Sequence, residues 1–135
     1  MFKILGLDHV VIRVRDVPRM MAFYRDVLGC AEERLKEDIG LYQLRAGNSL
    51  IDLIDVTGEL GKKGGAAPGP EAHNMDHFCL RIDAFEEAAL RAHLEKHGVP
   101  ASETAMRYGA DGTGYSIYIR DPEGNTVELK GPPSD

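Results

Sequence analysis

The feature of this sequence that most constrains its fold is an internal repeat. The segment Leu7–Val14 (LDHVVIRV) recurs as Met75–Ile82 (MDHFCLRI), with an Asp-His pair at the same place and an arginine four residues after each histidine. The two histidines, His9 and His77, lie 68 residues apart, about half of the 135-residue chain. A repeat of this length predicts two similar supersecondary units, each too small to bury its apolar face well alone.

Each copy of the repeat is followed by a helical pattern. After the first copy, Asp16 is placed to cap a helix, and Gly29 is the expected stop. After the second copy, Asp83 and Glu86 have the spacing of a capping box, and Gly98 is the expected stop. One helix is therefore predicted in each half of the chain.

Three strand-like segments follow each helix. They are expected at roughly 32–37, 41–46 and 49–55 in the first half, and at roughly 101–106, 115–120 and 126–130 in the second. Each half is therefore predicted to be a βαβββ module. We expect a single α+β domain over residues 1–135, with module one at about 4–56, a linker at 57–74 and module two at about 75–131.

Composition excludes several classes of function. The net charge of −6, without a basic stripe, argues against nucleic acid as a partner. The longest apolar run, Met20–Tyr24, is far shorter than a membrane span, and Lys3 and Asp8 interrupt any signal peptide. Cys30 and Cys79 have no zinc-binding spacing. They are expected to be reduced, fairly buried thiols of a cytoplasmic protein.

Strand alternation places four polar residues on the sheet face opposite the apolar, helix-facing side. Two of them are the repeated histidines, and the other two lie in the last strand of each module. A lone ionisable group there would cost on the order of a few kcal/mol, so four at repeated positions suggest a shared partner. Two imidazoles and two carboxylates suit Ni²⁺, Co²⁺, Zn²⁺, Mn²⁺ or Fe²⁺ better than Ca²⁺. The sequence therefore predicts a divalent metal site formed by His9, Asp52, His77 and Glu128.

These residues, together with two further motifs, resemble the vicinal oxygen chelate superfamily, which includes glyoxalase I, extradiol dioxygenases, fosfomycin-resistance proteins and bleomycin-binding proteins. The motifs are Phe23–Gly29 (FYRDVLG) and Ile119–Leu129 (IRDPEGNTVEL), and the resemblance covers essentially the whole chain. It implies two βαβββ modules whose mixed sheet curls into a cup around a metal ion, with the helices on the outside. It also implies metal ligands at His9, Asp52, His77 and Glu128.

The layout is most similar to small bacterial glyoxalase I-like proteins, which implies a metal-dependent lyase or isomerase of the lactoylglutathione lyase type. The ion would chelate vicinal oxygens of a small-molecule substrate, and Glu128 would move a proton. Arg13 and Arg81 share the faces of the two histidines and are expected to bind substrate, with Arg13 placed to meet a glutathione carboxylate. The segment 111–114 is expected to form a mobile lid.

A homodimer whose sites combine modules from two chains is also expected, because two-fold dimers are the commonest oligomers. Relatives in this superfamily commonly share sites in this way, although some keep each site within one chain.

Two other functions stay open. An Fe(II) ring-cleaving dioxygenase would use His9, His77 and Glu128 as its triad, but Asp52 would close a position that oxygen or catecholate needs. The sequence also offers no clearly placed proton donor for that reaction, apart from His73 in the linker. A non-catalytic small-molecule-binding or resistance protein is disfavoured because the chain has no Trp and only nine other aromatic residues with which to build a stacking pocket.

Overall fold

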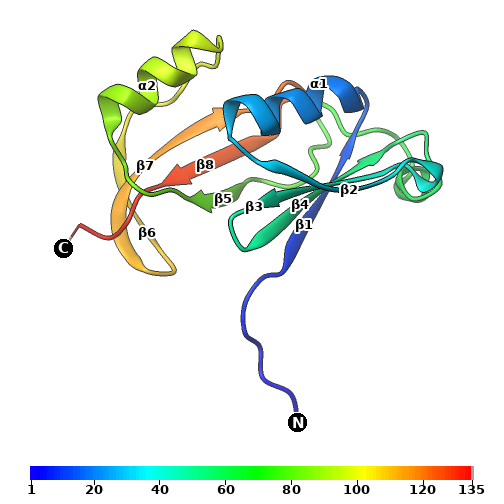
Figure 1. Cartoon of the computed structure of the whole chain (residues 1–135), viewed down its shortest axis with the longest axis horizontal. Helices are drawn as coiled ribbons and strands as arrows, with labels where there is room; N and C mark the ends of the chain where they lie inside the picture. The colour runs from blue at the N-terminus through cyan, green and yellow to red at the C-terminus, as the bar shows by residue number, and fades with distance from the viewer. Residues whose placement is uncertain (135) are drawn as a thin grey trace. The chain divides into compact units, whose positions relative to one another are not determined.

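The computed structural model describes residues 1–134 and has the predicted α+β architecture (Figure 1). The chain divides into two compact units, residues 1–74 and a second unit that begins at Met75. The first unit contains β1 (His9–Val14), α1 (Val17–Ala22), the π-helical turn η1 (Phe23–Val27), β2 (Ala31–Lys36), the 3-10 turn η2 (Glu37–Ile39), β3 (Leu41–Ala46), β4 (Ser49–Asp55) and the 3-10 turn η3 (Gly61–Gly64). The second contains β5 (Phe78–Arg81), α2 (Glu87–Lys96), β6 (Ala105–Gly109), β7 (Gly112–Arg120) and β8 (Thr126–Lys130).

Each unit has one four-stranded mixed sheet. The strand order is β1-β4-β3-β2 in the first unit and β5-β8-β7-β6 in the second. In both sheets the first strand pairs in parallel with the last, and the remaining neighbours are antiparallel. The identical strand order confirms two βαβββ modules of one plan.

Burial confirms the alternation predicted for β1. In the first module, Ile12 and Val14 of β1 and Leu53 of β4 are fully buried, as are Met20 and Tyr24 after the first strand. Each such side chain contributes about 1.5–3 kcal/mol when it is removed from water. The second module buries Ile117, Ile119, Val127 and Leu129, together with Leu94 of α2. Leu80 and Ile82, which are the repeat equivalents of Ile12 and Val14, are only partly buried. The core thus lies on the face opposite the four predicted metal ligands.

The first helix begins where the sequence predicts. The Asp16 side chain accepts a hydrogen bond from the backbone N–H of Arg19 at 3.1 Å, which caps α1. The helix continues into the π-helical turn, and Gly29 follows in a left-handed conformation with φ 74°. The predicted stop is therefore confirmed.

The predicted capping box of the second helix is wrong. The helix begins at Glu87, and Glu86 occupies the N-cap position without a side-chain capping bond. Tertiary contacts determine where this helix starts. The Phe85 ring stacks on the Tyr115 ring with the centroids 5.9 Å apart, and the Cβ of Phe85 lies where a Cβ on Gly131 would clash. The predicted stop at Gly98 is confirmed, with φ 69°.

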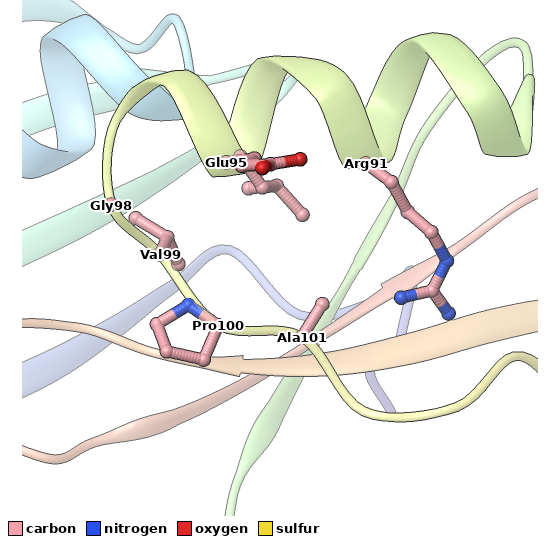
Figure 2. Close-up of a pocket in the computed structure, with 7 residues that line it drawn as sticks. Arg91, Glu95, Gly98, Val99, Pro100 and Ala101 are labelled. Atoms are coloured by element: carbon pink, nitrogen blue, oxygen red, sulfur yellow. The ribbon is translucent and has the colours of Figure 1, made fainter.

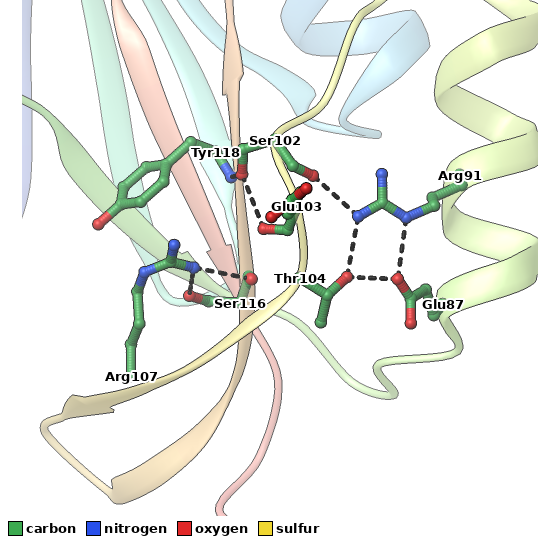
Figure 3. A network of polar contacts seen from close by, with 8 residues as sticks. All are labelled: Glu87, Arg91, Ser102, Glu103, Thr104, Arg107, Ser116 and Tyr118. Atoms are coloured by element: carbon green, nitrogen blue, oxygen red, sulfur yellow. Dashed lines mark hydrogen bonds and ion pairs between the residues drawn. The ribbon is translucent and has the colours of Figure 1, made fainter.

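Side-chain hydrogen bonds tie α2 to the chain that follows it (Figure 3). Arg91 donates to the Glu87 carboxylate, to the Thr104 hydroxyl and to the carbonyl of Ser102, and Thr104 also donates to Glu87. The Ser102 hydroxyl in turn accepts a hydrogen bond from the backbone N–H of Tyr118 at 2.8 Å. The network therefore links α2 to the middle of β7.

The predicted lid at 111–114 is also wrong. This segment belongs to a hairpin in which β6 and β7 stay paired up to the turn, where Gly109 lies opposite Gly112. The strand expected at 101–106 is therefore displaced toward this turn and lies at Ala105–Gly109. The glycines reflect close backbone packing, because a Cβ on Gly114 would lie 2.6 Å from the carbonyl oxygen of Pro132. Glycine here marks a close approach and not a hinge.

The two cysteines are free thiols. Cys30 is buried, as predicted, whereas Cys79 is exposed, so the prediction of a buried thiol is wrong for that residue. The reason is that Cys79 lies on β5, the edge strand of its sheet, on the face opposite the core. Within residues 1–134, no helix has the length and apolar character needed to cross a membrane.

Candidate metal centre

The first module brings two of the predicted ligands together. His9 opens β1, and Asp52 lies in the middle of the neighbouring strand β4. Nε2 of His9 and Oδ2 of Asp52 are 4.0 Å apart, and the two side chains are 45% and 7% exposed. A half-exposed imidazole therefore faces a buried carboxylate.

The second module repeats this arrangement. His77 lies immediately before β5, and Glu128 is in the neighbouring strand β8. Nε2 of His77 and Oε1 of Glu128 are 3.3 Å apart, and the Glu128 side chain is 9% exposed. The repeat in the sequence is thus a repeat of the side-chain geometry.

The aspartate before each histidine holds the other ring nitrogen. Nδ1 of His9 is 2.7 Å from Oδ1 of Asp8, and Nδ1 of His77 is 2.6 Å from Oδ2 of Asp76. An aspartate that accepts a hydrogen bond from Nδ1–H leaves the Nε2 lone pair free, and metal-binding histidines are commonly held in this way. The hydrogen bond to Asp8, followed by the charge of Asp52, raises the pKa of His9 above its usual value. The sequence showed the Asp-His repeat but not this role for the aspartates.

Gln43 is a site residue that the sequence analysis missed. It lies directly opposite Asp52 on β3, and its side-chain amide donates to both carboxylate oxygens at 3.2 Å. The sequence holds a signal for it. A two-residue turn pairs Ala46 with Ser49, and continuing this antiparallel register along the two strands places Gln43 opposite Asp52.

Tyr118 has the equivalent position in the second module. It lies opposite Glu128 on β7, and its ring packs edge-to-face on His77 with the centroids 5.4 Å apart. Burial, followed by the charge of Glu128, raises the pKa of the Tyr118 hydroxyl. The Arg107 guanidinium lies 4.5 Å from the centre of the ring and donates to Ser116 (Figure 3). Each carboxylate therefore faces a polar side chain on the adjacent antiparallel strand.

Cys79 lies opposite Glu128 on the parallel neighbour β5. Although the residue is exposed as a whole, its sulfur is partly shielded from water, and this desolvation, followed by the charge of Glu128, raises the pKa of its thiol to about 11. The group is a protonated thiol at neutral pH and a weak nucleophile.

Arg13 binds the protein's own linker. Its guanidinium donates to four backbone carbonyl oxygens, those of Gly61, Gly64, Gly65 and Ala66. Its backbone N–H and C=O both bind the Asn74 side chain at 3.0 Å. Arg13 thus fastens two parts of the linker, 61–66 and Asn74, to β1. These contacts give the Arg13 side chain a structural role that requires no substrate.

Arg81 also has a protein partner. Its Nε lies 2.8 Å from Oδ2 of Asp111, which stands in the turn of the β6–β7 hairpin. Substrate binding by Arg13 and Arg81 stays a prediction, and the function proposed below does not depend on it.

Two cavities of the second module are lined by residues other than its ligand pair. The larger, of about 440 Å³, is at the C-terminal end of α2, with Arg91, Leu94, Glu95 and residues 98–101 on its walls (Figure 2). A second, of about 360 Å³, includes Tyr118 in its lining. Neither His77 nor Glu128 lines either cavity.

The donor set of each module fits half of a divalent metal site. Among residues 1–134, no three His, Cys, Asp or Glu side chains are gathered closely enough to hold an ion. Each module supplies one imidazole whose Nε2 faces a buried carboxylate. Two such halves give the mixed nitrogen and oxygen donors that first-row divalent ions prefer, so the residues fit the predicted metal.

Comparison with known proteins now identifies the family. Residues 6–129 match the model of the Glyoxalase/Bleomycin resistance protein/Dioxygenase superfamily, and the chain belongs to this superfamily. It is 32% identical over 125 residues to the glyoxalase domain-containing protein RDO1 of Mycosarcoma maydis, a match that covers 92% of this chain and 66% of RDO1, just under two thirds. It is 25% identical over 134 residues to the mitochondrial methylmalonyl-CoA epimerase of Mus musculus, covering 96% of this chain and 74% of the epimerase.

Solved structures have the same fold. A lactoylglutathione lyase from Agrobacterium tumefaciens superposes with a TM-score of 0.68 at 27% identity, covering 94% of this chain and 93% of the lyase. A single-residue mutant of the fosfomycin resistance protein FosX of Listeria monocytogenes, in complex with Mn(II) and 1S,2S-dihydroxypropylphosphonic acid, superposes with a TM-score of 0.69 at 18% identity, covering 96% of this chain and 92% of FosX. At that identity FosX supports the fold alone.

Proposed function

We propose that this protein is a metal-dependent enzyme of the glyoxalase type. One divalent ion would be held by His9, Asp52, His77 and Glu128. The observation that carries the proposal is that both modules contain the same arrangement, a histidine held by the preceding aspartate with its Nε2 toward a buried carboxylate. Burying a carboxylate costs free energy of solvation, and this chain does so twice in the same geometry. The fold alone does not require this cost, whereas a shared function explains it.

The donors set the charge and the choice of ion. Two neutral imidazoles and two carboxylates carry −2, which balances a divalent cation, and they suit Ni²⁺, Co²⁺, Zn²⁺, Mn²⁺ or Fe²⁺. When bound, such an ion polarises two adjacent oxygens of a substrate and stabilises the negative charge that develops on them.

Glu128 is the residue proposed to move the proton. Its carboxylate would take a proton from one substrate carbon and return it to the neighbouring carbon, so that the reaction is an isomerisation without a net change of atoms. Glu128 suits this role because its side chain is one methylene longer than that of Asp52 and its carboxylate lies 3.3 Å from Nε2 of His77. The likeness to the A. tumefaciens lactoylglutathione lyase supports the hemithioacetal of glutathione and a 2-oxoaldehyde as the substrate.

The test is restoration of turnover by metal. Protein stripped with a chelator would be loaded in turn with each of the five ions and assayed with the hemithioacetal of methylglyoxal and glutathione. We expect S-lactoylglutathione to form with at least one ion and not with the stripped protein. Turnover of catechols with Fe²⁺ alone would instead favour the dioxygenase, and metal-bound protein that turns over neither substrate would favour a binding protein.

We also propose a homodimer whose sites each combine module one of one chain with module two of the other. His9→Ala protein mixed with an equal amount of Glu128→Ala protein would then form heterodimers with one intact site. At full exchange, heterodimers make up half of the dimers, so about a quarter of the wild-type metal content should return. Heterodimers seen by native mass spectrometry without any recovery of metal would show that each site belongs to a single chain.

A further inference from the structure

We propose that Gln43, held in place by Arg34, is a positioning residue that fixes the Asp52 carboxylate as a metal ligand. The inference rests on the proposed function and adds two residues to its site, neither of which would touch the ion.

The orientation of the Gln43 amide is determined by its two neighbours. Its Oε1 accepts a hydrogen bond from Nε of Arg34 at 2.8 Å, and its Nε2 donates to both oxygens of Asp52 at 3.2 Å. The arginine can only donate and the ionised carboxylate can only accept, so the reversed amide would lose both interactions. The amide therefore has one orientation, and it presents a donor to Asp52.

A β-bulge in β2 brings Arg34 to this position. The register between β2 and β3 shifts between Glu32 and Arg34, and as a result Arg34 stands opposite Gln43. Without the shift, Glu33 would stand there and place a second carboxylate next to the amide. Glu33 instead pairs with Arg45, at 3.1 Å. Bulges commonly re-aim side chains in this way beside functional sites.

Asp52 is held from two sides. It is 5% exposed, and Nε2 of His9 is 4.0 Å from its Oδ2. From the neighbouring strand the Gln43 amide, itself fixed by the charged donor Arg34, meets both oxygens of the carboxylate. These contacts leave the Asp52 carboxylate little freedom to turn, as a fixed metal ligand requires.

The experiment is a double-mutant cycle on metal affinity. Gln43→Met keeps the length of the side chain and removes both hydrogen bonds. We expect the dissociation constant for Zn²⁺ or Mn²⁺, measured by competition with a chelator, to rise about 10- to 100-fold, as for other residues that hold metal ligands in place. In the Asp52→Ala background the same substitution should change the constant less than about twofold, because its effect acts through Asp52. Arg34→Met should weaken binding in the same direction, and Arg34→Lys should restore most of the loss.

Arg45→Met is the matched control. It removes an arginine from the same pair of strands, one whose partner is Glu33 and not the amide, and we expect it to leave metal affinity unchanged. A purely structural role for Gln43 would lower the melting temperature of the metal-free protein without changing affinity, and that result would overturn the inference. So would an effect of Gln43→Met that is equally large without Asp52. If wild-type protein binds no divalent ion, the proposed function and the inference are both wrong. The measurement on wild-type protein by itself separates this case from a failure of the inference alone.

Discussion

Replacing either His9 or His77 with alanine is expected to abolish tight binding of a divalent ion while the fold survives. Each histidine supplies one of four donors, and loss of a direct ligand should cost at least as much as the roughly 10- to 100-fold loss typical of the residues that support ligands. Both side chains are only partly buried, 45% and 32% exposed, and lie on the face opposite the core. Calorimetric titration with Zn²⁺ would measure the loss, and far-UV circular dichroism would check the fold.

His93→Ala is the control for these two substitutions. His93 lies on the exposed surface of α2, with its ring 4.8 Å from that of His97, and it is not one of the proposed ligands. Tight binding should be unchanged in this variant. Wild-type affinity in either His9→Ala or His77→Ala protein would contradict the proposed ligand set.

Glu128→Gln is expected to lower kcat/KM about 100- to 10,000-fold, the usual contribution of a general base. The amide keeps an oxygen that can bind the ion but cannot accept the proton, so the variant should still retain metal. Steady-state kinetics on the metal-loaded variant, with its metal content measured on the same sample, separates the two effects.

Asp52→Asn provides the comparison for that result. Because Asp52 is proposed to hold the ion and not to move the proton, its substitution by an amide that keeps a ligand oxygen should leave turnover at saturating metal within about tenfold of wild type. If the two variants lost turnover equally at saturating metal, the assignment of Glu128 as the proton carrier would be wrong.

Much of the fold follows from local patterns in the sequence. The repeat around His9 and His77, the alternation in the last strands and the glycine stops at Gly29 and Gly98 predict both modules, and the structure confirms them. These features depend on neighbours within a few residues or on a period of two, which a single sequence displays directly.

The errors arise where distant contacts override local signals. The capping spacing at Asp83 is unused because Phe85 packs against Tyr115 and Gly131. The glycines of the β6–β7 hairpin suggested a mobile loop, but Gly114 is a glycine because the backbone of Pro132 passes close by. Neither contact can be inferred from nearby residues.

The same division between local and distant signals applies to the candidate site. The four proposed ligands follow from strand alternation and the family resemblance, whereas their supporting residues depend on the pairing of strands. Gln43 could have been predicted, because the register across the two-residue turn places it opposite Asp52. Arg34 was not, because its place opposite Gln43 depends on a bulge that no local motif announces. The linker contacts of Arg13 were also beyond local signals, because its guanidinium donates to backbone carbonyl oxygens about 50 residues further along the chain, while its binding of substrate stays a prediction.

The most direct test of this account is the number of divalent ions that each chain binds. The proposal unites a histidine and carboxylate pair from module one with the equivalent pair from module two, so a titration of metal-free protein with Zn²⁺, checked by elemental analysis, should reach one tightly bound ion per chain. His9→Ala and Glu128→Ala, one in each module, should each remove that ion entirely. Two ions per chain, with one of them surviving each substitution, would show that the modules bind metal separately and would contradict a shared site.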